Sequence, residues 1–245
     1  MTPKAKPSRI ASSFLGWLCA PLVGALGASA TLLPYIDPTA STTAIQAMGP
    51  IFAIGLMGSG MIGAALTGSF AKGMMIALVC GLFLTGLSFA LGTPFEANLL
   101  ALGIAIAIAS VSFAARGALF ARSAGDRGWF IASAIVAGEG AILVTAFLIP
   151  DALPKWLLSL LPARWASLAI QSTGAEKLPH FIYPLLALGG TAAATALVTK
   201  LLPKRMPYLI MFTVWLCLST LVYHQTDWDM VQIEEAGTQS SIAKP

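Results

Sequence analysis

The stretch from Trp129 to Ile149 constrains the fold of this chain most strongly. It is 21 residues long, and Glu139, near its middle, is its single charged residue. An α-helix needs about 20 predominantly apolar residues to cross the hydrocarbon core of a bilayer. A carboxylate at that depth costs at least about 2.5 kcal/mol unless it is paired, protonated or hydrated. The stretch therefore predicts a transmembrane helix with one ionisable group inside it.

The composition of the whole chain places it among membrane proteins. It is 57% hydrophobic and 10% charged, whereas soluble domains carry about 25% charged residues. Long, unbroken apolar runs favour helices over the short alternating strands of a membrane β-barrel. The net charge of +4 does not indicate nucleic acid as a partner, because the basic residues fall in separate short segments.

The apolar runs predict an all-α polytopic transmembrane helical bundle with seven spans in one domain, residues 1–224. The spans are 10–33, 44–66, 73–91, 97–115, 129–149, 181–198 and 208–223, and a polar extra-cytoplasmic tail covers 225–245. The first run has an alternative interpretation as a cleaved secretory signal, since Ala28-Ser29-Ala30 fits the small-residue cleavage pattern.

Basic residues predict the orientation, because cytoplasmic loops are enriched in Lys and Arg. With the N-terminus inside and the C-terminus outside, 10 of the 14 basic residues are cytoplasmic: Lys4, Lys6, Arg9, Lys72, Arg116, Arg122, Arg127, Lys200, Lys204 and Arg205. We expect the group after the fourth span, which includes Arg116, to determine topology. The predicted location is a bacterial-type cytoplasmic (inner) membrane.

Residues 154–170 are apolar enough for an eighth span, but Pro162 and Arg164 would then lie near the bilayer centre. We instead predict an interfacial amphipathic helix, extra-cytoplasmic and between spans five and six. Trp156 and Trp165 would lie at headgroup depth, with Lys155 and Arg164 directed toward water.

The second span is rich in small residues at four-residue spacing, which lets helix backbones approach closely. The helix-packing residues are Gly55, Ser59 and Gly63 on one face and Gly60, Ala64 and Gly68 on another. The alternative is a substrate-lining helix interrupted at Pro50. Gly58-Ser59-Gly60 lacks the spacing of a serine nucleophile elbow, because methionines occupy the outer positions.

Glu139 is the candidate residue for transport or proton relay, with Thr191 and Thr195 of the sixth span as possible partners. Ionisable residues within the membrane commonly mark ion or substrate pathways. The alternative is a structural, protonated glutamate that is hydrogen-bonded to a neighbouring helix.

His180 and His224 lie at the outer ends of the last two spans, and Asp227 follows closely. Together they could bind zinc or copper, but interfacial histidines are commonly amphipathic anchors. No cofactor is predicted, since neither histidine lies deep enough for haem and no lysine lies at mid-depth for retinal.

Three functions fit these features. The first is a small secondary transporter or channel that uses Glu139 for proton or cation coupling. The second is a non-catalytic structural or assembly subunit, with other membrane protein subunits as partners besides the lipid bilayer. The third is a membrane-embedded enzyme that modifies lipids, for which the sequence offers only Arg116, Arg122, Asp126 and Arg127 near one interface.

Overall fold

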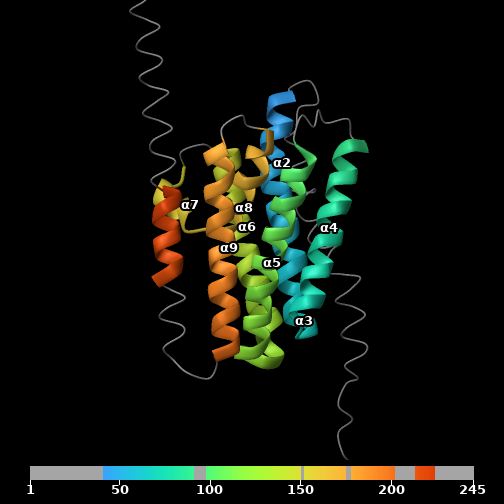
Figure 1. Cartoon of the computed structure of the whole chain (residues 1–245), viewed down its shortest axis with the longest axis vertical. Coiled ribbons are helices and arrows are strands. Elements are labelled where there is room, and N and C mark those ends of the chain that lie inside the picture. Colours follow the sequence, from blue (N-terminus) through green and yellow to red (C-terminus); the bar gives the residue numbers. More distant parts are fainter. Residues whose placement is uncertain (1–40, 91–97, 150–151, 175–177, 202–212, 224–245) are drawn as a thin grey trace, which may run out of the picture.

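The computed structural model describes residues 41–90, 98–149, 152–174, 178–201 and 213–223. These residues form helices and no strands, which confirms the predicted all-α class. The long helices pack side by side in a bundle (Figure 1). The predicted first span and the C-terminal tail lie outside the described residues.

The helices follow the apolar runs of the sequence in order. They are α2 (Ser41–Met57), the π-helical turn η2 (Gly58–Ile62), α3 (Gly63–Thr67), α4 (Phe70–Ala90), α5 (Leu99–Ala124), the 3-10 turn η3 (Gly125–Arg127), α6 (Gly128–Leu148), α7 (Lys155–Ser159), α8 (Pro162–Gln171), the 3-10 turn η4 (Ser172–Gly174) and α9 (Leu178–Leu201). A further apolar helix covers Thr213–Tyr223.

Four stretches of the described chain are long and apolar enough to cross a membrane. They are Ala47–Thr67, Phe70–Ala90, Leu99–Leu148 and Phe181–Thr199. The third is 50 residues long and contains both α5 and α6, which pack against each other on either side of η3. These stretches agree with a membrane protein.

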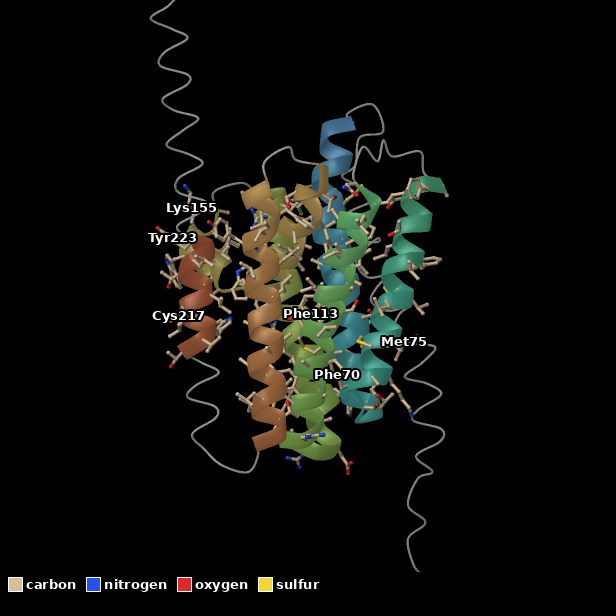
Figure 2. All side chains as sticks on the ribbon, in the orientation of Figure 1. Phe70, Met75, Phe113, Lys155, Cys217 and Tyr223 are labelled. Carbon is tan, nitrogen blue, oxygen red and sulfur yellow. The ribbon has the colours of Figure 1, made fainter. Side chains whose placement is uncertain are left out.

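The outer surface of the bundle is apolar. On α4, Leu82 is 69% exposed and Phe83 is 59% exposed. Met75, 47% exposed, lies on the outer edge of the same helix (Figure 2). An apolar face of this kind is suited to lipid rather than water.

The interior is built on close approach between helix backbones. A Cβ atom at Gly117 of α5 would lie 2.1 Å from the carbonyl oxygen of Met61 in η2, and one at Gly73 of α4 would lie 2.4 Å from Ala64 Cβ. Only glycine fits at these points, so α4 and α5 contact the segment α2–η2–α3 almost backbone to backbone. Phe52, Phe113 and Trp165 fill the spaces between the helices.

Candidate functional site

Glu139 contacts the N-terminal end of another helix. Its Oε2 atom accepts a hydrogen bond from the backbone N–H of Ala163 in α8, over 3.2 Å. Pro162 begins α8 and has no N–H to donate, while the N–H groups of Arg164 and Trp165 donate back to the carbonyl of Leu161. Ala163 therefore supplies the N-terminal donor of α8 that is directed at Glu139. A carboxylate in this position is also favoured by the helix dipole.

The position of α8 explains how its N-terminus reaches Glu139. The helix packs between α2 and α9, and its residues Ala163, Trp165, Ala166 and Ala169 are buried. Gly49 of α2 allows the approach, because a Cβ there would lie 2.7 Å from the carbonyl oxygen of Ser167. The short α7 precedes α8, and Trp165 Nε1 donates to the carbonyl of Ser159 at 2.8 Å, which fixes the turn between them.

The structure therefore differs from the predicted interfacial helix over 154–170. Trp165 is 0% exposed and lies inside the protein, whereas Trp156 is 58% exposed. The amphipathic pattern is real, and the apolar face of α8 packs against α2 and α9, so the buried position of Trp165 does not confirm the predicted interfacial location. An apolar helix face indicates a partner surface without specifying whether that surface is lipid or protein.

Arg116 is a second charged residue that packs within the bundle, although the sequence predicts it in a cytoplasmic loop. Helix α5 does not end near Ala115 but continues to Ala124, so Arg116 lies about two helical turns from its end. The guanidinium lies over the ring of Phe113, 5.8 Å from its centroid. Phe113 lies in the middle of the bundle (Figure 2).

Arg116 and Glu139 interact electrostatically across the α5–α6 hairpin. The positive charge of Arg116 and the negative charge of Glu139 attract each other. Among the described residues, the two side chains do not form a direct ion pair. The Nη2 atom of Arg116 is buried and has no hydrogen-bond partner among the described residues. The sequence contains a pattern that could have predicted this pair. Arg116 and Glu139 lie a few helical turns before and after the same short connection, Gly125–Gly128, so they would face each other in a helical hairpin.

Thr191 and Thr195 both lie on the last long helix of the described chain. Their helix, α9, packs along α5. The Thr191 hydroxyl donates to the carbonyl of Leu188 at 2.9 Å and lies 3.5 Å from the hydroxyl of Ser112. The Thr195 hydroxyl donates to the carbonyl of Thr191 at 2.7 Å. These contacts of the two threonine hydroxyls join groups of α5 and α9.

The small residues of the second span lie within and on either side of the π-helical turn η2. Ser59 donates to the carbonyl of Gly55 at 2.7 Å, within its own helix. A Cβ at Gly60 would lie 3.2 Å from Ala77 of α4, and one at Gly63 would lie 2.9 Å from Ile76 of the same helix. Ala64 packs beneath Gly73, and Gly68 ends α3 in the left-handed region at φ 63°. Isolated π-helical turns are frequent at functional sites of helical proteins.

The proposed metal ligands cannot be placed. His224 and Asp227 lie outside the described residues, and of His180 only the backbone, in α9, is described. Among the residues that are described, no group of three His, Cys, Asp or Glu side chains could hold a metal ion.

Comparison with protein families, curated proteins and solved structures found no match to this chain.

Proposed function

We propose that this chain is a small secondary transporter of a bacterial-type inner membrane, with Glu139 as its proton- or cation-coupling residue. It would have seven spans, with its N-terminus inside and its C-terminus outside. The basic residues support this orientation. The α3–α4 turn and η3 lie at the same end of the bundle, where the chain carries Lys72 near the first and Arg122 and Arg127 near the second (Figure 1). Lys155 lies toward the opposite end (Figure 2).

The observation that carries the proposal is the hydrogen bond from Ala163 to Glu139. It joins an ionisable group to a helix N-terminus, and Arg116, whose Nη2 atom is buried, is close enough to interact with the Glu139 charge. Transporters commonly form their sites from interrupted helices whose N-terminal ends face charged groups near the bilayer midplane. A glutamate that alternates between charged and neutral forms could hold and release α8, and so couple proton movement to a change of conformation.

Complementation with matched variants tests this proposal. A deletion strain is screened for a growth defect, and wild type, Glu139→Gln and Ser133→Ala are compared at equal protein levels. Ser133 lies on the same helix and its hydroxyl donates to the carbonyl of Trp129, so Ser133→Ala controls for a general effect of altering α6. We expect Glu139→Gln to fail and Ser133→Ala to complement. Full complementation by Glu139→Gln would remove the main support for transport.

The same hydrogen bond also favours a second candidate, a structural or assembly subunit in which Glu139 only anchors α8. That function requires the acceptor oxygen but no titration, so Glu139→Gln should complement fully. A stoichiometric partner in mild detergent should then accompany both wild type and Glu139→Gln.

The lipid-modifying alternative draws less support from the charged residues near η3. Arg116 lies inside the bundle, and Arg122 Nη1 donates to the carbonyl of Thr199 at 2.7 Å.

A further inference from the structure

The Nη2 atom of Arg116 is an unsatisfied donor in a packed interior. Neither the described side chains nor the described backbone supplies an acceptor for it. A buried donor without a partner is costly, and the cost is larger when the donor belongs to a charged group. Such atoms in native structures generally mark a bound ligand, ion or water, or a strained functional group. The guanidinium is planar and presents parallel N–H donors, a geometry that matches a carboxylate.

The charges around Arg116 restrict what can bind there. Glu139 is the carboxylate that acts on it. The elements packed against α5 and α6 carry few other charged groups. Arg122 is bonded to Thr199, Asp126 and Arg127 are exposed in η3, Lys72 lies at the start of α4, and Arg164 lies on α8. The titratable His180 and the basic Lys200 belong to α9 and lie near its two ends. Among the described side chains, none of these is hydrogen-bonded to Arg116 or Glu139. The Arg116–Glu139 pair is therefore neutral when both groups are ionised.

This neutrality links anion binding to proton uptake. A monovalent anion beside Arg116 would leave one excess negative charge in the interior, and that charge is costly in a medium of low dielectric constant. If Glu139 takes up one proton as the anion enters, the net charge of the region stays at zero. The neutral carboxyl also holds the Ala163 N–H less strongly, so the N-terminus of α8 can turn its dipole toward the anion.

We propose that Arg116 binds a small monovalent carboxylate and that Glu139 is protonated in the bound state, which makes the protein a proton–carboxylate symporter. This inference rests on the proposed transport function and adds the substrate class. The substrate must be small, since the neighbouring Phe113 and Met61 are fully buried and α5 contacts η2 at Gly117 with no space between the backbones.

Binding of pyruvate to the purified protein in mild detergent tests the inference. Thermal unfolding is followed against pyruvate concentration from about pH 5 to about pH 8, with sodium sulfate to hold the ionic strength constant. For one proton taken up per anion, the apparent Kd of wild type should rise about tenfold per pH unit wherever free Glu139 is ionised. In Glu139→Gln, pyruvate should still bind and the Kd should no longer depend on pH.

Variants of Arg116 test the site itself. Arg116→Lys keeps the charge but loses the paired donors, so the Kd should rise by about tenfold or more. Arg122→Lys, at the end of the same helix, is the matched control and should bind as wild type does. The double variant Glu139→Gln/Arg116→Met carries no charge at the site, so neither residue is left as an uncompensated buried charge that would prevent folding. This variant should not bind pyruvate.

The outcomes separate this inference from the proposed function. No stabilisation of wild type by pyruvate at any pH, or equal stabilisation of the double variant, would overturn the carboxylate site. The requirement for Glu139 in complementation would be untouched by that result. Conversely, pH-dependent binding through Arg116 together with full complementation by Glu139→Gln would keep the site and remove proton-coupled transport.

Discussion

Glu139 and Arg116 are the two side chains whose surroundings are hardest to reconcile with a purely apolar interior. The carboxylate of Glu139 has a backbone donor in Ala163, and it also offsets the charge of Arg116. Removing one member of a buried charge pair is generally more destabilising than removing both, because the remaining charge is left uncompensated. The contributions of the hydrogen bond and of the charge can therefore be separated by substitution.

We expect Glu139→Leu to lower the free energy of unfolding by about 3 kcal/mol, because both the Ala163 N–H and the Arg116 charge lose their partner. Glu139→Gln should lower it by about 1–2 kcal/mol, since the amide oxygen can still accept from Ala163. The double variant Glu139→Gln/Arg116→Met should be more stable than Glu139→Gln alone. Thermal unfolding in mild detergent measures all three, and equal losses for Gln and Leu would show that the hydrogen bond to Ala163 contributes nothing.

At the scale of the helices, α8 is placed by its fit against α2 and α9 and by the hydrogen bond inside its own turn. We expect Trp165→Phe to destabilise the protein by about 1–2 kcal/mol, because it removes the indole donor to the Ser159 carbonyl while keeping an aromatic ring. Trp156→Phe should change the stability by less than about 0.5 kcal/mol, since Trp156 is largely exposed. Similar effects at the two tryptophans would instead fit a helix that lies wholly at the interface.

The contact between α5 and η2 gives a second test at this scale. In Gly117→Ala the new methyl group would overlap the Met61 carbonyl, so the helices must separate, and we expect a loss of about 3 kcal/mol. Gly103→Ala is the matched control in the same helix, because a Cβ there meets nothing within 4 Å. It should be neutral or stabilising by up to about 1 kcal/mol. Unfolding of both variants in detergent provides the comparison, and an unchanged Gly117→Ala would contradict the close approach.

For the whole molecule, the proposed orientation places η3 in the cytoplasm and the α6–α7 connection outside. Asp126 and Ala152 are both exposed and suit cysteine labelling, after Cys19, Cys80 and Cys217 have been replaced. In intact cells a membrane-impermeant thiol reagent should label Ala152→Cys, and it should label Asp126→Cys only after permeabilisation. The reverse pattern would invert the topology and leave the helical packing unaffected.

The sequence by itself determined the class of this protein and its most unusual residue. Long apolar runs bounded by charges and glycines suffice for that, because the backbone polar groups of a chain in lipid must be satisfied within each helix. The all-α class and the apolar outer surface follow from the same runs. Glu139 is recognisable because a single carboxylate is conspicuous in such a run.

Only the tertiary structure decided where α8 and Arg116 lie. A transmembrane span predicted from hydropathy ends at the first charged residue, so the sequence predicts that α5 stops before Arg116. In the structure α5 continues past Arg116, and the opposite charge of Glu139 on the neighbouring helix of the hairpin offsets the charge of Arg116. The amphipathic face of α8 likewise has two possible partners, and Gly49, more than a hundred residues earlier in the chain, provides the surface that receives it. Both outcomes depend on contacts between segments far apart in sequence, and hydropathy and periodicity carry no information about such contacts.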